Sequence, residues 1–159
     1  MNRSPFAAIE VLLIDGNNLL HRTAGSAGEH ALRGLLPRLS MVIPPTISCI
    51  VMLDGFAAPG GGRTERVRPG LEIRHSGPLS ADDALLNLLR DAPHGRAMTT
   101  VVSDDRALRD RVRAMGVHTE RLAWLEELLN PRLPRQNFRP VSIGNRKPSV
   151  PPPLRNKRR

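Results

Sequence analysis

The chain has 159 residues and a formal net charge of +9, which suits one folded domain with a short extension. With three Phe, one Trp and no Tyr, its core must consist of aliphatic side chains, and the lone Cys49 excludes a disulfide framework and a cysteine-based zinc site. No stretch approaches the roughly 20 apolar residues of a membrane span, and the first apolar run is broken by Glu10, unlike a signal peptide, so we expect a cytoplasmic protein without a membrane partner.

Apolar runs typical of buried strands alternate with helical patterns along the first 130 residues. The predicted strands are Val11–Ile14, Ile47–Leu53, Leu71–His75, Thr99–Ser103 and Val117–Leu122. The predicted helices are about 18–39, interrupted near Gly25 and Gly28; one that begins after a cap at Ser80; one with Ala107, Leu108, Val112 and Met115 on its apolar face; and Trp124–Leu129. Pro59–Gly62 is predicted to be a mobile loop. This alternation predicts an α/β domain over residues 1–130, with a mainly parallel sheet between helices.

Residues 131–159 have a different composition. They contain nine Lys/Arg, no acidic residue and seven of the fifteen prolines, so we predict a separate, extended or disordered tail. Clusters of Lys and Arg bind phosphates through counterion release, and Lys157, Arg158 and Arg159 are therefore predicted to contact RNA or the ribosome. The alternative is an extension that only increases solubility.

Four acidic turns stand where predicted strands end or a helix begins. They contain Asp15; Asp54; the pair Asp82 and Asp83; and the pair Asp104 and Asp105. The carboxyl ends of parallel strands share one edge of a sheet, where these carboxylates would repel each other unless a hard cation lay among them. Each turn alone is also common as turn or helix-cap chemistry. Their convergence predicts a divalent-metal site.

These residues resemble a known family. The succession Leu13-Ile14-Asp15-Gly16-Asn17-Asn18, Leu53-Asp54-Gly55, Ser80-Ala81-Asp82-Asp83 and Val102-Ser103-Asp104-Asp105 is similar to that of the NYN-domain nucleases, which are PIN-like ribonucleases, and most of all to their YacP-like branch. The resemblance covers about residues 11–125. It implies a Rossmann-like three-layer α/β/α sandwich and metal-dependent cleavage of RNA phosphodiester bonds. We expect an endonuclease, although the sequence does not distinguish this from an exonuclease.

The resemblance also implies roles for individual residues. Asp15, Asp82 and Asp105 match the family's catalytic carboxylates, Ser103 its hydroxyl, and Asp54 the Asp-Gly of the YacP-like branch. Asp83 and Asp104 are additional candidate ligands. The expected cofactor is Mg²⁺ or Mn²⁺, because these ions prefer oxygen ligands and can activate a bound water.

Other residues were assigned from chemistry alone. Asn17 or Asn18 could orient that water or a phosphate oxygen, and His21 lies one turn further on. Arg63 and Arg106 are predicted to hold RNA phosphates. The expected substrate is single-stranded RNA, free or on the ribosome, and the sequence predicts no oligomeric state.

Three other functions compete with this prediction. A noncatalytic RNA- or ribosome-binding protein with a degenerate site would show no response to Mn²⁺. A structure-specific 5′-nuclease has a first motif similar to residues 15–22, but such proteins are larger and carry a helical arch. A receiver domain would need a Lys after a late strand, whereas both Lys of this chain lie in the tail.

Overall fold

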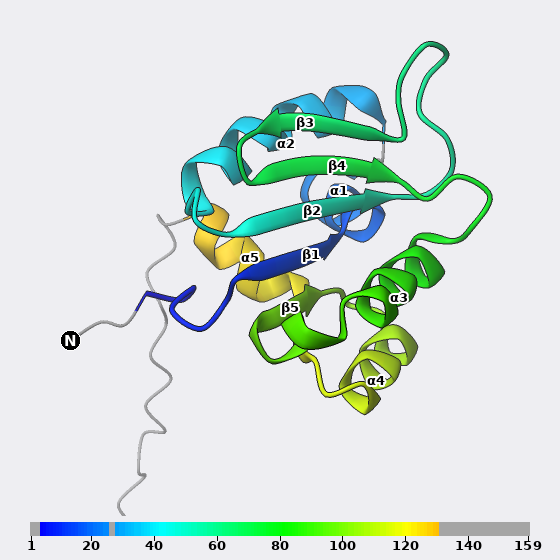
Figure 1. The fold of residues 1–159 in the computed structure, drawn as a ribbon. Coiled ribbons are helices and arrows are strands. Elements are labelled where there is room, and N and C mark those ends of the chain that lie inside the picture. Colours follow the sequence, from blue (N-terminus) through cyan, green and yellow to red (C-terminus); the bar gives the residue numbers. More distant parts are fainter. Residues whose placement is uncertain (1–3, 26–27, 131–159) are drawn as a thin grey trace, which may run out of the picture.

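A six-stranded sheet forms the centre of the molecule (Figure 1). The computed structural model describes residues 4–25 and 28–130, and the predicted tail lies outside them. The strands are β1 (Val11–Asp15), β2 (Ser48–Leu53), β3 (Thr64–Arg68), β4 (Leu71–His75), β5 (Thr99–Val102) and β6 (His118–Glu120). The helices are α1 (Gly16–Ala24), α2 (Glu29–Val42), α3 (Ala81–Asp91), α4 (Arg106–Ala114) and α5 (Leu122–Leu129), with a 3₁₀ helix, η1 (Pro93–Met98).

The strands lie in the order β3-β4-β2-β1-β5-β6. β1 is central and pairs in parallel with β2 and β5, while β4 and β6 extend the parallel sheet on either side. Only β3 is antiparallel. The carboxyl ends of five strands therefore point to the same edge, as the alternating sequence pattern predicts.

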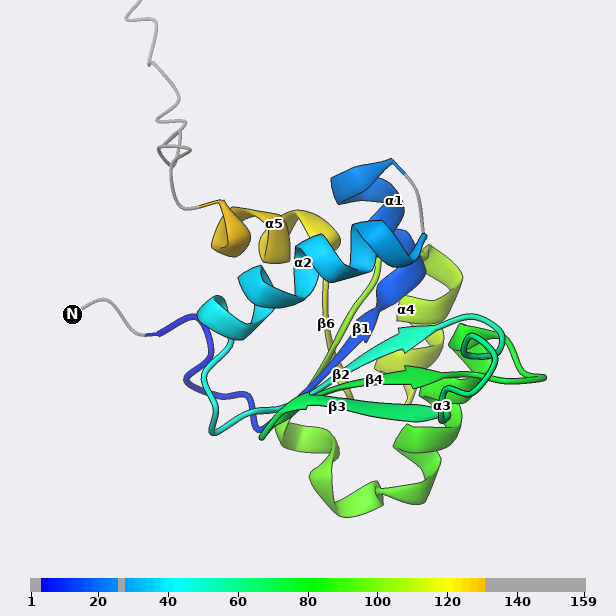
Figure 2. The ribbon, with the colours of Figure 1, turned by 90° about the horizontal axis from the view of Figure 1, so that it is seen from above.

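Helices cover both faces of this sheet (Figure 2). Because successive side chains of a strand point to opposite faces, Leu12 and Ile14 of β1 pack against α1, α2 and α5, whereas Leu13 packs against α3 and α4. The chain thus has two aliphatic cores and three layers. The predicted three-layer α/β/α sandwich with a mainly parallel sheet is confirmed.

The structure adds one strand, β3, in a region for which the sequence pattern predicts neither a strand nor a helix. β3 pairs with β4 across the two-residue turn Pro69-Gly70, in which Gly70 has a φ of +81°. β3 is a short, charged edge strand whose residues are mostly exposed, so its sequence lacks the apolar pattern of a core strand. The Pro-Gly pair between two short runs was the available signal.

Other element boundaries differ by a few residues. Gly25, with φ +71°, ends α1, which confirms the predicted interruption of the first helical region. Leu122 begins α5 and does not end β6, because its side chain is buried with Leu125 and Leu129 on one helical face. Among the residues that the structure describes, no helix is both long and apolar enough to cross a membrane.

Candidate active site

The edge formed by the carboxyl ends of β1, β2 and β5 carries most of the predicted site. Asp15 ends β1 and caps α1, Asp54 follows β2, and Asp105 caps α4 after β5. Asp82 lies in the first turn of α3, whose cap is Ser80. Strand ends and helix N-termini thus bring carboxylates from four turns to one side of the sheet, where the helix dipoles favour negative charge.

Asp15 is the most buried of these carboxylates, with 4% of its surface exposed. Its Oδ2 accepts hydrogen bonds from Asn18 Nδ2 at 2.6 Å and from Ser103 Oγ at 2.9 Å, and its Oδ1 accepts from the Asn18 amide at 3.3 Å. Three donors therefore hold one carboxylate in a fixed orientation. The structure brings together the predicted trio Asp15, Asn18 and Ser103.

Gly16 explains why Asp15 can sit at this position. A Cβ at Gly16 would lie 2.7 Å from the carbonyl oxygen of Met52 in the neighbouring strand. Real Cβ atoms do not approach so closely, so α1 can start directly against β2 only with glycine. The Asp-Gly pair is thus required by packing as well as by turn formation.

Ser103 also links Asp15 to Asp105. Its Oγ accepts a hydrogen bond from the Asp105 amide at 3.1 Å, while Asp105 Oδ1 accepts from the Leu108 amide at 3.0 Å. Ser103 is fully buried, and its hydroxyl donates to the Asp15 carboxylate and accepts from the Asp105 amide. The serine of the Ser-Asp-Asp turn therefore orients the carboxylate of Asp15 and holds the backbone of Asp105.

Asp54 joins the second strand to two helices. Its Oδ1 accepts from the Ala81 amide at 2.6 Å, and its own amide donates to Asn17 Oδ1 at 2.8 Å. The end of β2 is thereby tied to the first turns of α1 and α3. Asn17 acts as a structural link here, while Asn18 is the asparagine that contacts Asp15.

The pKa of Asp82 reflects the other acids of the cluster. Partial burial, and then the negative charges of Asp15, Asp105 and Asp54, raise the pKa of Asp82 to about 6, and Arg111 opposes the rise. Burial and nearby negative charges both favour the neutral form of a carboxyl group. Asp15, Asp105 and Asp54 are therefore close enough to Asp82 for their charges to add to the effect of burial.

The carboxylates do not form a finished metal site in this conformation. Within residues 4–25 and 28–130, no three acidic, histidine or cysteine side chains lie close enough together to hold a metal ion. Asp15, Asp54 and Asp105 each turn an oxygen toward an N–H group of the protein. Like charges move apart when such donors are available. A cluster of carboxylate oxygens that contributes to the raised pKa of Asp82 nevertheless fits a hard divalent cation, which would relieve the repulsion.

Asp83 and Asp104 have partners of their own. Asp104 accepts from Arg22 Nη1 at 2.9 Å and from the Leu122 amide at 3.0 Å, and thereby holds the start of α5. Asp83 lies 3.5 Å from Arg111 Nη2. These contacts give both residues a structural role, and their assignment as metal ligands stays a prediction.

The basic residues that were predicted to contact RNA do not lie among the carboxylates. Arg106 is fully on the surface, with 89% of its side chain exposed and only a long ion pair of 3.8 Å to Asp110. Arg63 donates to the carbonyl oxygen of Ser76 at 3.2 Å. His21 is exposed on α1. Lys157, Arg158 and Arg159 lie outside the described residues.

Sequence reasoning missed three residues around this edge. Arg111 of α4 faces Asp82 and Asp83, and buried Ser76 accepts from the Gly55 amide at 3.0 Å; neither has a recognisable sequence signal. Phe56, two residues after Asp54, is 73% exposed and did have a recognisable sequence signal. In a chain with 3% aromatic residues, a Phe directly after an acidic turn is unusual.

Comparisons with known proteins agree on the fold. The structure is similar to the crystal structure of Rae1 (YacP) from Bacillus subtilis, with a TM-score of 0.59 and 16% identity over 78% of this chain and 77% of that one. A variant of the same protein, with one Trp replaced by Leu, gives a TM-score of 0.58 and 18% identity over 78% and 79% of the two chains. No family model and no curated protein matches the sequence. The chain therefore has a fold similar to that of Rae1 (YacP), and the predicted resemblance to the YacP-like branch is confirmed at the level of the fold.

Proposed function

We propose that this protein is a divalent-metal-dependent ribonuclease that hydrolyses phosphodiester bonds of single-stranded RNA. The observation that carries the proposal is the convergence of Asp15, Asp54, Asp82 and Asp105 at one sheet edge, expressed in the raised pKa of Asp82. A fold similar to that of Rae1 (YacP) supports it. An apolar or fully paired edge would have served the fold equally well, whereas four unneutralised acids have a cost that binding of a cation removes.

In this proposal, Asp15, Asp82 and Asp105 hold Mg²⁺ or Mn²⁺, with Asp54 beside them. When bound, the metal lowers the pKa of a water and neutralises the charge that develops on the phosphate. Ser103 and Asn18 orient the carboxylate of Asp15, so that its oxygens need not reorganise during the reaction. Without a metal the pKa of Asp82 is raised to about 6, and a bound cation would favour its charged form.

The substrate class follows from the surroundings of the edge. Phe56 is exposed beside Asp54, and exposed aromatic rings bind unpaired bases by stacking. Bases inside a duplex are already stacked and could not use this ring. We therefore infer single-stranded RNA as the substrate, with the basic segment 131–159 as an additional, nonspecific RNA contact.

Cleavage of a labelled single-stranded RNA with Mn²⁺, and with EDTA in its place, tests the activity. Asp15→Asn should abolish the cleavage, whereas Asp110→Asn, which changes an exposed acid in the middle of α4, should not. A circular RNA substrate then separates the modes, because only an endonuclease can open a circle. Metal-independent cleavage, or full activity of Asp15→Asn, would contradict the proposal.

A noncatalytic RNA- or ribosome-binding protein is the second candidate. It is favoured by one observation, that no three metal-binding side chains of the described residues lie within reach of one ion. Such a protein would bind RNA equally well with Mn²⁺ and with EDTA and would leave it intact. Its Asp15→Asn variant would bind RNA at least as tightly as the wild type, because a negative charge is removed from the edge of the sheet that faces the RNA.

A further inference from the structure

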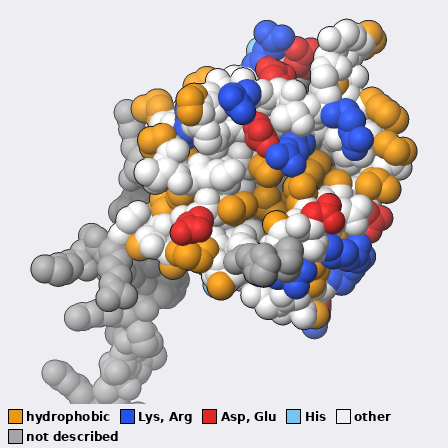
Figure 3. Space-filling model, viewed as in Figure 1, with side chains coloured by type: hydrophobic (Ala, Val, Ile, Leu, Met, Phe, Trp, Pro, Cys, Tyr) orange, Lys and Arg blue, Asp and Glu red, His pale blue; other side chains and the backbone are white. Residues whose placement is uncertain are grey.

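A hollow of about 410 Å³ lies beside the acidic edge, on the sheet face that carries α3. Helices α3 and α4 pack here against side chains of β1, β2 and β5, and this core contains no residue of β3 or β4. In Figure 1, β3 and β4 accordingly have no helix in front of them. The hollow occupies the step between this uncovered half of the sheet and α3, where Figure 3 shows basic and apolar side chains next to each other.

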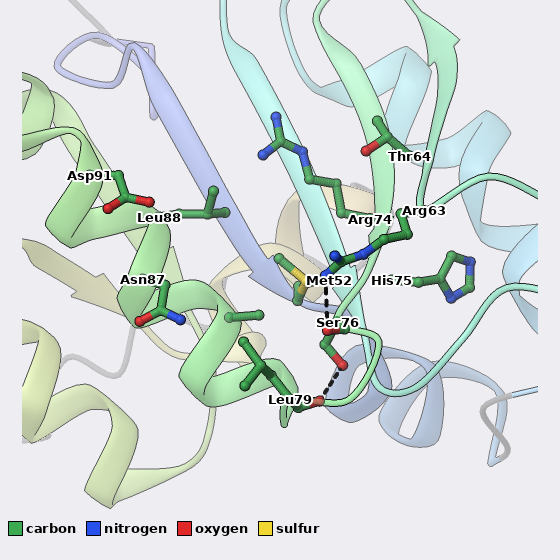
Figure 4. Close-up of a pocket in the computed structure, with 11 residues that line it drawn as sticks. Met52, Arg63, Thr64, Arg74, His75, Ser76, Leu79, Asn87, Leu88 and Asp91 are labelled. Atoms are coloured by element: carbon green, nitrogen blue, oxygen red, sulfur yellow. Dashed lines mark hydrogen bonds between the residues drawn. The ribbon is translucent and has the colours of Figure 1, made fainter.

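Arg63 supplies positive charge to the hollow (Figure 4). Its Nη2 donates to the carbonyl oxygen of Ser76, and within the described part of the chain no carboxylate pairs with it. Arg74, the other arginine of the lining, is neutralised by Glu72, whose Oε1 lies 2.7 Å from Arg74 Nε. Arg63 therefore retains both an uncompensated charge and N–H donors, which are the features that bind a phosphate group.

The remaining lining suits a flat, partly polar group. Met52 is buried at the bottom of the hollow, and Ala84 and Leu88 of α3 form its side. Asn87 accepts from Arg90 with its Oδ1 at 2.9 Å, so its amide nitrogen is the group left to donate. The carboxylate of Asp91 also lines the hollow and would repel a bare anion. A ligand with one phosphate and one base matches this mixture better than an inorganic ion does.

One segment of the chain borders both the hollow and the acidic edge. Ser76 accepts from the Gly55 amide, and Gly77 donates to the Gly55 carbonyl at 2.7 Å, directly after Asp54. Asp54 in turn accepts from the amide of Ala81, at the start of the helix that carries Asp82. Residues 76–81 therefore border both places. An RNA strand whose phosphate reaches the carboxylates would bring a neighbouring nucleotide to the hollow.

We propose that this hollow binds one nucleotide of single-stranded RNA next to the bond that is cut, with Arg63 on its phosphate and Met52, Ala84 and Leu88 against its base. This subsite rests on the proposed ribonuclease function and names where that substrate is held. Arg63 and Ala84 take no part in the metal chemistry, so the subsite can be tested by RNA binding alone.

The test uses the full chain, a short fluorescently labelled single-stranded RNA, and EDTA to prevent cleavage. Arg63→Gln should weaken binding about tenfold, since one charge-assisted contact is lost, and should lower the log–log salt slope by about 0.7. Ala84→Leu fills the hollow without changing the charge, and it should weaken binding with an unchanged slope. The matched control is Arg33→Gln on α2, on the other side of the sheet, which should do neither. Circular dichroism and thermal melting establish that each variant is folded.

Equal affinities and slopes for Arg63→Gln and Arg33→Gln would overturn the subsite. A competition experiment with 5′-AMP and 5′-UMP tests whether the hollow binds free nucleotides instead of RNA. If these nucleotides bind the hollow without displacing RNA, the proposed RNA subsite is also contradicted. The results also distinguish a failure of the proposed ribonuclease function from a failure of the proposed subsite. Weaker RNA binding by both hollow variants, together with a wild type that never cleaves, would remove the ribonuclease and leave an RNA-binding hollow; a wild type without RNA affinity would remove both.

Discussion

Ser103 Oγ donates to Asp15 Oδ2 at 2.9 Å, and this hydrogen bond joins the ends of two neighbouring strands across 88 positions of sequence. Both side chains are buried, and the same hydroxyl accepts from the Asp105 amide. One serine thus orients the carboxylate of Asp15 and holds the backbone from which the Asp105 side chain extends. This makes it a positioning residue for any cation bound by these acids.

Ser103→Ala is expected to destabilise the metal-free protein by about 1–3 kcal/mol, because the buried Asp15 carboxylate and the partly buried Asp105 amide each lose a partner. Cleavage should fall as well, since Asp15 loses its orientation. Urea unfolding and RNA cleavage measure the two effects. Ser48→Ala, at the exposed start of β2, is the control and should change neither. A Ser103→Ala protein with wild-type stability would show that the hydroxyl is dispensable.

The raised pKa of Asp82 predicts a particular pH dependence of stability. Its pKa is about 6 when folded and about 3.9 when unfolded. Protonated Asp82 is therefore favoured by folding, and this stabilising contribution is complete below pH ~4 and is lost as the pH rises through 6. In EDTA, the wild type should gain stability relative to Asp82→Asn as the pH falls from 7 to 4. Parallel stability curves for the two proteins would show that folding does not raise the pKa of Asp82.

Metal binding should remove the destabilising repulsion among the carboxylates. Mn²⁺ is expected to raise the free energy of unfolding by about 3 kcal/mol at a concentration roughly 100 times its Kd, because a cation replaces repulsion among the carboxylates with attraction. Asp15→Asn should reduce or abolish this gain, whereas Asp110→Asn should keep it. Thermal melting over a series of Mn²⁺ and Mg²⁺ concentrations provides the measurement. If neither metal changes the melting temperature of the wild type, the proposed metal site is contradicted.

Phe56 offers a prediction about the substrate. Phe56→Ala should weaken binding of single-stranded RNA by roughly tenfold, as expected for one lost base stack, without loss of stability, since the ring is 73% exposed. Phe56→Trp should bind like the wild type. Met41→Ala removes another exposed apolar side chain, on α2, and serves as the control. An effect on duplex RNA as large as that on single strands would argue against stacking.

The central part of the fold could be predicted from the sequence because its strands contain unbroken apolar runs. Val11–Ile14 and Ile50–Leu53 have no polar residue, which is typical of a sheet covered on both sides. β3 could not be predicted in the same way, because an edge strand with exposed Glu65 and Arg66 has no apolar face to reveal it. The boundary between β6 and α5 was missed because Leu122 fits both a strand and a helix.

The candidate site was predictable to a similar degree. Asp15, Asp54 and Asp105 follow apolar runs, and parallel strands necessarily bring such residues to one edge. Sequence spacing cannot distinguish a carboxylate that faces the edge from one that pairs with an arginine, and Asp104 and Arg22 are 82 positions apart. Arg111 was invisible for the same reason, since its contact with Asp83 depends on how α4 packs beside α3. Long-range pairs of charged residues require the structure.

The basic segment 131–159 yields the last prediction. Its deletion should leave the metal response and most of the stability unchanged, because the aliphatic cores are built from residues 6–129. The same deletion should weaken RNA binding and flatten its salt dependence. Nine cations without an acid among them could touch several phosphates, and each contact adds roughly 0.7 to the log–log slope for a single strand.

Affinity measured across a salt series on the full and the shortened chain checks this prediction. Replacing the nine Lys and Arg by Gln within the full-length chain provides the matched control, because it removes the charge and keeps the length. Both proteins should show the same reduced slope if charge alone is responsible. Slopes equal to that of the wild type would show that the segment does not hold RNA, and RNA binding would then depend on the folded domain, on Arg63 and Phe56 beside the acidic edge.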